Sequence, residues 1–245
     1  MKRELVYDQV NPVVMLTHNA LALTKEAVKS VLEQDIPVQL HVVDNHSTDG
    51  TAEWLQSLDI PNISLFDPPL GVSSGWNYAL VNIFRVCDHA LVVNNDVYLR
   101  PDTYRSLLDD GGQFVTAVSV DNMAGIEGEW AKAPRPHPDF SCFMIRKSVW
   151  DKVPGFDESM VLYASDGDYH LRMHQAGIKA YTIGIPFYHY ASGTLKSVHP
   201  NAAHRIQQQA DRDRDRFEQK WGVKVGSREY YQLFGHGAPD EKEGQ

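Results

Sequence analysis

Short apolar runs alternate with amphipathic segments over the first two-thirds of the chain, and this alternation limits the possible folds more than any other feature. The runs at residues 13–16, 40–43, 63–66 and 90–93 have the length and composition of buried strands. Helical patterns lie between them, and the clearest covers residues 76–84. Strands and helices at this spacing predict an α/β fold with a mostly parallel central sheet and helices on both faces.

Further elements are expected along the chain, and some have start signals. Thr24 is expected to cap one helix, and Ser73 or Ser74 the next helix. The remaining predicted elements are strands at 114–120, 140–145 and 180–183, a helix at about 166–175, and a long last helix that begins at Pro200.

The formal net charge of −9 bears on the possible partners. Tight binding of duplex nucleic acid usually needs a basic face, and the alternating Asp-Arg run at 211–216 is typical of a solvated, salt-bridged helix face. No run approaches the ~18 apolar residues that span a bilayer, and the N-terminus lacks the apolar core of a signal peptide. Cys87 and Cys142 lie in apolar stretches, as buried reduced thiols do. We therefore expect a cytoplasmic protein without a transmembrane segment.

Polar residues follow three of the predicted strands at their carboxyl ends. Residues 17–19 are Thr-His-Asn, residues 44–45 are Asp-Asn, and residues 94–96 are Asn-Asn-Asp. Ligands of open α/β sheets bind beyond the carboxyl ends of the strands, so these groups are expected to share one site. Neither a glycine-rich dinucleotide motif nor a P-loop follows any strand. A bound nucleotide would therefore be held with the help of carboxylates and a metal ion.

Four residues are candidates for the chemistry of such a site. Asp44 can accept hydrogen bonds from a ribose or a base, and Asp96 can bind Mg2+ or Mn2+ beside a diphosphate. Asp166 can act as general base toward an acceptor hydroxyl, and His189 as a further metal ligand. Each also has a plain structural interpretation. Asp44 can belong to a capped turn and Asp96 to an Asx-turn. Asp166 can be a helix N-cap beside a surface Asp168–Arg172 pair, and His189 can be a structural histidine.

The order of these motifs resembles that of family 2 glycosyltransferases with the GT-A fold, especially their rhamnosyltransferase-like branch. The resemblance runs from about Val13 to Tyr190. Its landmarks are Thr-His-Asn at 17–19, Val-Asp-Asn-His-Ser-Thr-Asp-Gly-Thr at 43–51, Gly-Val-Ser-Ser-Gly-Trp-Asn at 71–77, Asn-Asn-Asp at 94–96, Gly-Phe-Asp-Glu at 155–158, Ser-Asp-Gly-Asp-Tyr-His-Leu-Arg at 165–172, and His189. The chain departs from the family at Asn94, where the metal motif has its first acidic residue, and at Ser165, where a glutamate is usual.

The resemblance implies an inverting, metal-dependent transfer of a sugar from a UDP- or dTDP-sugar to a hydroxyl acceptor. Asp166 would be the general base, and Asp96 and His189 would bind a divalent cation, Mn2+ or Mg2+. The expected donor-binding residues are Thr17, His18, Asn19, Asp44, Asn45, Gly75, Asn77, Asn95 and Lys196. Because Ser165 replaces a carboxylate, we expect less like-charge repulsion at Asp166 and a lower tendency of this base to stay protonated.

The acceptor and two rival functions stay open at this point. A glycan acceptor is favoured, with a lipid-linked sugar, a protein side chain or a modified nucleobase as alternatives. A sugar nucleotidyltransferase would carry a glycine-rich, arginine-containing loop after the first strand, which residues 17–21 lack. A non-catalytic nucleotide-sugar-binding module with a decayed transferase site would fit the departures at Asn94 and Ser165.

The length fits one large domain, with or without a small appendage. We expect a single GT-A domain at residues 1–222, with a nucleotide-sugar-binding half at about 11–100, an acceptor and catalytic half at 101–199, and a C-terminal helix at 200–222. Residues 223–245 are expected to form an extension whose end is disordered. The loop at 121–138 is rich in glycine, proline and charge, and its candidate acceptor contacts are Trp130, Arg135 and His137.

Overall fold

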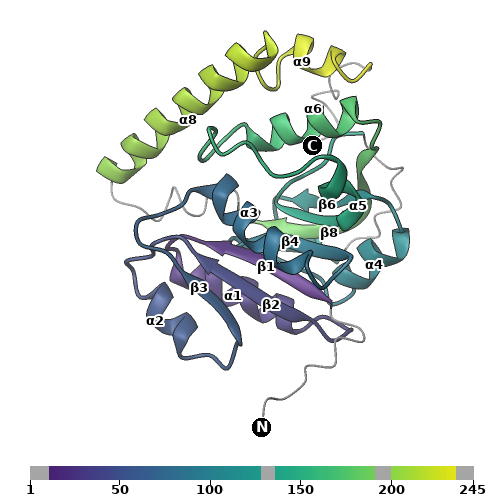
Figure 1. The fold of residues 1–245 in the computed structure, drawn as a ribbon. Helices are drawn as coiled ribbons and strands as arrows, with labels where there is room; N and C mark the ends of the chain where they lie inside the picture. Colours follow the sequence, from purple (N-terminus) through teal and green to yellow (C-terminus); the bar gives the residue numbers. More distant parts are fainter. Residues whose placement is uncertain (1–10, 128–135, 191–199, 236–245) are drawn as a thin grey trace.

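The computed structural model describes residues 11–127, 136–190 and 200–235. An eight-stranded sheet runs through the centre of this part of the chain, in the order β3-β2-β1-β4-β7-β6-β8-β5 (Figure 1). The strands are β1 (Pro12–Thr17), β2 (Gln39–Asp44), β3 (Asn62–Leu65), β4 (His89–Asn94), β5 (Val97–Tyr98), β6 (Phe114–Val120), β7 (Cys142–Arg146) and β8 (Ala180–His189). The pairs β3–β2, β2–β1, β1–β4 and β6–β8 are parallel, and the other three pairs are antiparallel. The predicted α/β fold with a mostly parallel sheet is confirmed.

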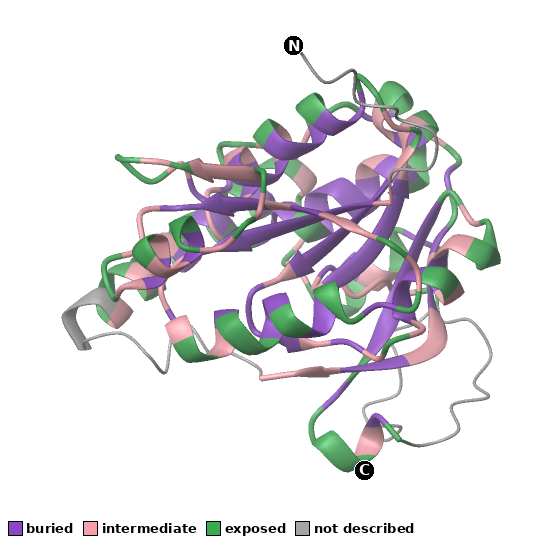
Figure 2. Cartoon of the chain, turned by 90° about the horizontal axis from the view of Figure 1, so that it is seen from below, coloured by how far each residue is buried: buried purple, intermediate pink, exposed green. Residues whose placement is uncertain are grey.

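Helices cover both faces of this sheet. They are α1 (Leu21–Leu32), α2 (Thr51–Gln56), α3 (Val72–Ile83), α4 (Thr103–Asp110), α5 (Lys147–Lys152), α6 (Ser165–Gln175), α8 (Pro200–Trp221) and α9 (Arg228–Gln232), with a 3₁₀ turn η1 (Met123–Gly125). Side chains of β1 alternate between two cores: Val14 and Leu16 pack with α3, α5 and α6, while Val13 and Met15 pack with α1, α2 and α4. Figure 2 shows the buried strands in the middle and helices that are buried only on their inner sides.

The strand register brings the polar ends of three strands to one edge of the sheet. Thr17 at the end of β1 is paired with Asp44 at the end of β2, and Leu16 is paired with Asn94 at the end of β4. Parallel pairing therefore gathers the three polar groups that the sequence analysis singled out, because it aligns the carboxyl ends of the strands.

The last two helices form a third core on the outer side of α6. Phe217 of α8 and Tyr230 of α9 are buried there with Met160, Ala164, Leu171 and Phe234. Figure 1 shows α8 running along the outside of the molecule, beyond α6. Residues 223–235 thus pack against the preceding helices, and residues 236–245, where a disordered end is predicted, lie outside the described residues. None of the described helices is both long and apolar enough to cross a membrane.

The predicted helix caps are wrong. Thr24 lies inside α1, buried, and its hydroxyl donates to the carbonyl of Asn19. Ser73 lies in the first turn of α3, and its hydroxyl donates to the carbonyl of Met160 at 2.5 Å. The residues that precede the two helices are Ala20 and Gly71, whose positive φ angles turn the chain without a side-chain cap. The hydroxyl groups make tertiary contacts instead.

Two predicted solvated faces are also partly buried. Asp213, in the alternating Asp-Arg run, has no exposed surface and accepts hydrogen bonds from the backbone N–H groups of Leu162 and Tyr163. Asp168, interpreted as half of a surface pair, is likewise fully buried and binds Arg172 at 2.8 Å. Charge alternation shows only that a helix carries charge, whereas burial of these two carboxylates depends on the long-range packing of α8.

Candidate active site

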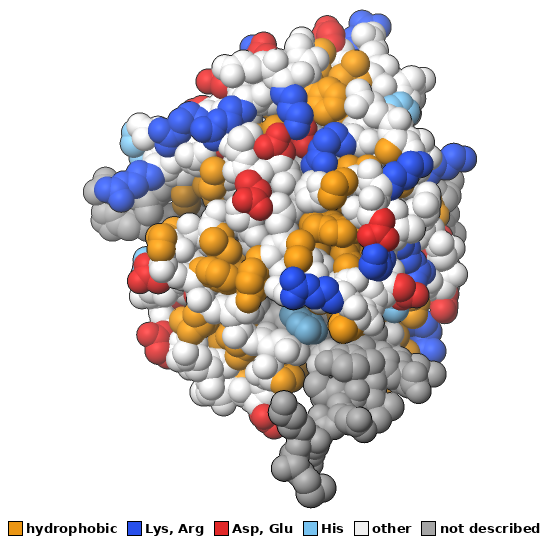
Figure 3. All heavy atoms as spheres, viewed as in Figure 1, with side chains coloured by type: hydrophobic (Ala, Val, Ile, Leu, Met, Phe, Trp, Pro, Cys, Tyr) orange, Lys and Arg blue, Asp and Glu red, His pale blue; other side chains and the backbone are white. Residues whose placement is uncertain are grey.

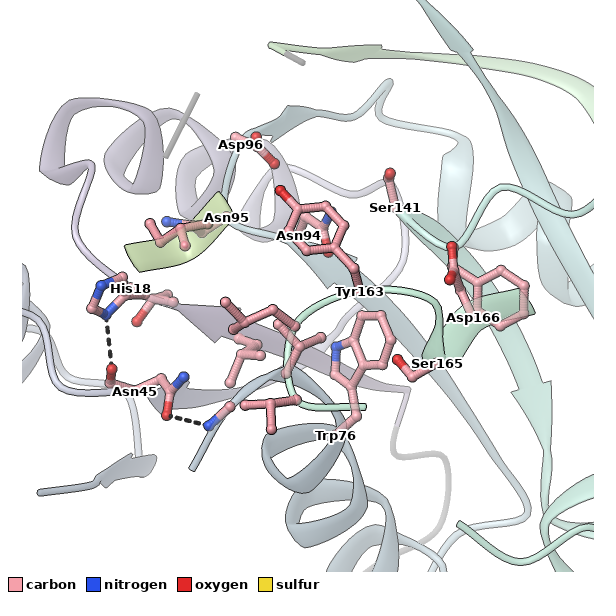
Figure 4. A pocket seen from close by; sticks show the side chains of 18 of the residues that line it. His18, Asn45, Trp76, Asn94, Asn95, Asp96, Ser141, Tyr163, Ser165 and Asp166 are labelled. Atoms are coloured by element: carbon pink, nitrogen blue, oxygen red, sulfur yellow. Dashed lines mark hydrogen bonds between the residues drawn. The ribbon is translucent and has the colours of Figure 1, made fainter. Parts of the chain in front are cut away.

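A pocket of about 840 Å³ opens at the carboxyl edge of the sheet. The end of β1, the turn between β4 and β5, residues 138–141, residues 161–166 and His189 form its walls (Figure 4). The predicted site residues that line it are Thr17, His18, Asn45, Asn95, Asp96, Asp166 and His189. The structure therefore brings most of the predicted donor, metal and base residues to one cavity.

The loop after β1 is fixed by hydrogen bonds between its own polar side chains and its neighbours. The His18 ring contacts the Asn45 carbonyl through Nδ1 at 2.8 Å and the Asn19 amide through Nε2 at 3.2 Å. An amide NH2 can only donate, so the imidazole carries its proton on Nδ1. Asn95 donates to the Asn19 carbonyl and to Thr24. Asn19 itself has a left-handed backbone (φ 57°) and does not line the pocket.

Three predicted donor residues lie behind the pocket wall. Asp44 is buried, and its carboxylate accepts from Thr17 at 2.8 Å and from the Ser47 hydroxyl at 2.6 Å. Asn77 donates to the Phe156 carbonyl and to Glu158, and so holds the 155–158 turn. A Cβ at Gly75 would lie 2.5 Å from the Leu16 side chain, so glycine here lets α3 approach β1. The contacts observed for these three residues support the wall of the pocket.

Asp96 and His189 face each other across the pairing of β5 and β8. His189 Nε2 lies 3.3 Å from Asp96 Oδ1, and the register places Val97 opposite His189. Burial lowers the pKa of His189, but the hydrogen bond and the charge of Asp96 outweigh burial, so the pKa is raised overall. A pairing between strands far apart in sequence therefore creates this carboxylate–imidazole pair.

Asp166 stands in the first turn of α6, directly after the strained residue Ala164 (φ 64°) and Ser165. Its side chain is exposed to the pocket, with the Gly167 N–H 2.9 Å from one carboxylate oxygen. Enclosure by the pocket walls raises the pKa of the Asp166 carboxyl, and the negative charge of Asp139 adds to this rise. Because the Asp166 carboxyl stays in contact with solvent, it lies in an open cleft and not in a dry core.

Asp139 is a pocket residue that the sequence analysis missed. It lines the cavity just before β7, and its negative charge raises the pKa of both Asp166 and His189. Ser141 N–H donates to its carboxylate at 2.9 Å. Ser165 stands where the family usually has a glutamate, and Asp139 thus supplies a negative charge near Asp166 from another segment. Nothing in the local Pro-His-Pro-Asp sequence distinguishes this aspartate from an ordinary loop residue.

The loop before the base is held from two sides. On one side, the Val72 N–H at the start of α3 donates to the Val161 carbonyl at 2.7 Å. On the other side, Asp213 of α8 accepts from the N–H groups of Leu162 and Tyr163 at 2.7 and 3.1 Å. These bonds satisfy backbone groups that would otherwise be unpaired, and they fix the wall that leads into Asp166.

Positive charge is scarce in this pocket. Among the described residues, its lining contains His18 and His189 but no lysine or arginine. Figure 3 shows several Lys and Arg side chains on the upper part of this face of the molecule, including the region that α8 occupies in Figure 1. Lys196, predicted to reach the diphosphate, and the candidate contacts Trp130 and Arg135 lie outside the described residues. His137 packs edge-on against Tyr231 and does not line the pocket.

The donor set at Asp96 and His189 fits a divalent cation in part. A carboxylate oxygen and an imidazole nitrogen suit Mn2+, with phosphate and water oxygens to complete the shell. Within the described ranges, however, no three His, Cys, Asp or Glu residues converge closely enough to hold a metal ion. A cation at this pair would therefore depend on ligands from the bound substrate.

The fold and the site together define a GT-A glycosyltransferase. The model of glycosyl transferase family 2 matches residues 13–171, and the chain belongs to this family. It is 25% identical to an N-acetylglucosaminyl-diphospho-decaprenol L-rhamnosyltransferase from Mycobacterium tuberculosis, over 69% of this chain and 71% of that protein. The predicted family and its rhamnosyltransferase-like character are confirmed.

Solved structures with this fold include two whose complexes contain nucleotide sugars. S. aureus TarS 1-349 in complex with UDP-GlcNAc has a TM-score of 0.61 at 16% identity, covering 92% of this chain and 70% of that one. The mannosyltransferase PcManGT from Pyrobaculum calidifontis, in complex with GDP-Man and Mn2+, has a TM-score of 0.55 at 18% identity. It aligns with 82% of this chain, which spans 60% of the mannosyltransferase. At these identities the likeness shows the fold.

Proposed function

We propose that the chain transfers a sugar from a nucleoside diphosphate sugar, either a UDP- or a dTDP-sugar, to a hydroxyl acceptor with inversion at the anomeric carbon. One observation carries this proposal: the Asp96–His189 pair and Asp166 lie on different walls of the same cavity of about 840 Å³. A cavity of this size accommodates a small ligand, and its two ends suit a leaving diphosphate and an attacking hydroxyl.

Asp166 is the proposed general base. In a single displacement, the acceptor hydroxyl oxygen bonds to the anomeric carbon while its proton passes to Asp166 and the nucleoside diphosphate leaves with the bonding electrons. The raised pKa of Asp166 makes it a stronger base than an ordinary aspartate. The bonds from α3 and Asp213 that fix residues 161–163 support its position.

Asp96 and His189 are the proposed metal ligands. When bound, Mn2+ or Mg2+ would supply positive charge to the leaving diphosphate. The scarcity of described lysine and arginine side chains in the lining supports this role, since the diphosphate needs a positive partner. The Pyrobaculum mannosyltransferase, whose complex holds GDP-Man together with Mn2+, supports the proposal of a metal-assisted site in this fold.

The acceptor is proposed to be a hydroxyl group of a glycan. The Mycobacterium relative is named for the transfer of rhamnose to N-acetylglucosaminyl-diphospho-decaprenol, which supports a sugar hydroxyl as acceptor. The donor-binding side of the pocket is proposed at His18 and Asn45, beside the end of β1.

The experiment is thermal melting with UDP, dTDP, GDP and their sugars, with and without Mn2+, followed by a donor-hydrolysis assay. A ligand at 100 times its dissociation constant stabilises the folded state by about 2.7 kcal/mol, a shift of roughly 5–10 °C at this length. We expect a metal-dependent shift for one class of nucleotide, and hydrolysis of its sugar. If no nucleotide shifts the melting temperature, the transferase proposal is wrong; if a nucleotide sugar binds but is not hydrolysed, a decayed binding module is the better description.

A further inference from the structure

The indole nitrogen of Trp76 has no hydrogen-bond partner. Trp76 in α3 is only 5% exposed, and its Nε1 is one of three buried side-chain polar atoms in the described residues that lack a partner. The other two belong to His89 and Thr103, which do not line the pocket, whereas Trp76 does. Figure 4 shows its ring among the lining side chains, on the side where Ser165 and Asp166 lie.

An unpaired indole N–H restricts what can bind beside it. The group is a donor only, and a buried donor without a partner is destabilising. The ring contacts Phe143 and Phe156, with centroids 5.6 and 4.9 Å away, so its orientation is fixed by packing. A ligand oxygen that accepts from this N–H would remove the cost, which makes the nitrogen a candidate recognition group.

Three other polar side chains of the lining are uncharged and available for hydrogen bonds to a ligand. The side chains of Asn94, Ser141 and Ser165 line the pocket and make no hydrogen bond within the described residues. The lining has the carboxylates of Asp139 and Asp166 and the Asp96–His189 pair, and no described lysine or arginine lies in it. A ligand with several hydroxyl or carbonyl oxygens fits this lining, and a carboxylate-bearing sugar is repelled by it.

We propose that the Trp76 N–H donates a hydrogen bond to an oxygen of the transferred sugar, and that this part of the pocket selects an uncharged sugar over a uronic acid. The inference rests on the proposed function, in which the sugar lies between the diphosphate at Asp96 and the base at Asp166. Trp76 lines the same cavity as these two groups, on the side of Ser165 and Asp166 (Figure 4). The nitrogen is screened from solvent in the free chain, so the proposed bond requires a neighbouring lining side chain to turn aside when the sugar enters.

The test compares Trp76→Phe with Trp150→Phe. Trp150 packs against the same core but does not line the pocket, so it controls for the loss of indole packing. Calorimetry in Mn2+ measures the affinity for UDP, dTDP, UDP-glucose, dTDP-glucose and UDP-glucuronate. We expect Trp76→Phe to weaken nucleotide-sugar binding about tenfold and to leave free nucleotide binding unchanged. We also expect the unaltered protein to bind UDP-glucuronate no more tightly than UDP.

Several outcomes would overturn the inference. These are an equal loss for free nucleotide and nucleotide sugar, a loss below twofold, the same loss in Trp150→Phe, or preferential binding of UDP-glucuronate. If the unaltered protein binds free nucleotide but none of the sugars, the Trp76 proposal fails alone; if it binds neither, the proposed function fails with it. A second measurement covers poor folding of the variant. In ¹⁵N NMR of the unaltered protein, the Trp76 indole proton should shift with nucleotide sugar and not with free nucleotide, and the absence of a selective shift counts against the inference.

Discussion

The carboxylate of Asp213 in α8 accepts a 2.7 Å hydrogen bond from the backbone N–H of Leu162. The same oxygen accepts from the next N–H, and Gln209 donates to the other oxygen at 2.7 Å. A helix near the end of the chain thus holds the loop that precedes the proposed base. Among the described side chains of α8, Ile206 alone lines the pocket. The Asp213 bonds therefore give α8 a further role in the site.

Asp213→Ala is expected to destabilise the protein and to slow transfer. The change leaves two backbone N–H groups without their acceptor. We therefore expect the free energy of unfolding to fall by about 2–4 kcal/mol and the melting temperature by roughly 5–15 °C. Below the melting transition, kcat should fall more than donor affinity, because the base loses its fixed position. Asp215→Ala, an exposed residue of the same helix, is the control. Equal melting temperatures in the two variants would contradict this account.

Asp166→Asn should abolish transfer and stabilise the fold. Loss of a general base typically costs ~100- to 10,000-fold in rate, while donor binding should be retained. The raised pKa of Asp166 means that its charged form is disfavoured in the folded state, so removal of the charge should raise the melting temperature at pH 7. The stability difference should vanish below about pH 4, where the unfolded carboxyl is also protonated. Transfer at the normal rate would exclude Asp166 as base.

Asp139→Asn tests the second carboxylate of the pocket. Its negative charge raises the pKa of Asp166, so its removal should lower that pKa. Since the base must be unprotonated to act, activity should then persist to lower pH, and the acid limb of the kcat/KM profile should move toward acid. Glu158→Gln, on the turn that Asn77 holds and outside the pocket lining, is the control. An acid limb that stays in place would show that Asp139 does not act on the base.

Metal dependence is tested at Asp96. EDTA should abolish transfer, and Asp96→Asn should remove the extra thermal shift that Mn2+ gives to the nucleotide, because an amide is a poorer ligand for a hard cation than a carboxylate is. Asp121→Asn, exposed and outside the pocket lining, should keep the shift. Full activity in EDTA would rule out the metal role of Asp96 and His189.

The sequence predicts the parts of this structure that depend on local patterns. The runs 13–16 and 90–93 are recognisable as strands because every side chain in them is apolar, and parallel pairing then brings residues 17 and 94–96 together. The place of Asp139 could not be predicted, because it depends on how residues 138–141 run beside α6 and β8. The burial of Asp213 depends on docking of α8, and Ala20 adopts a left-handed conformation that its residue type disfavours.

Lys220→Met probes the ion cluster that attaches the end of α8. Lys220 Nζ lies 2.6 Å from Asp157 and 2.7 Å from Asp168, which is fully buried. Desolvation raises the pKa of Asp157, but bonds from Lys220 and Ser159 outweigh it and hold the pKa at about 2. A depressed carboxyl pKa stabilises the folded state above pH ~4, and this stabilisation is lost as the pH falls from about 4 to 2.

We therefore expect Lys220→Met to lower the free energy of unfolding by about 1–3 kcal/mol at pH 7, because Asp157 loses its cation. The loss is limited because Asp168 keeps Arg172 as a partner. Urea unfolding at pH 7 and at pH 2.5 measures the difference, which should be smaller at the lower pH. Lys152→Met, an exposed lysine at the end of α5, controls for the removal of one positive charge. If Lys220→Met and Lys152→Met unfold at the same urea concentration at pH 7, the cluster does not stabilise α8. If the loss of unfolding free energy in Lys220→Met is the same at both pH values, the loss arises from packing of the lysine stem and not from the ion pairs.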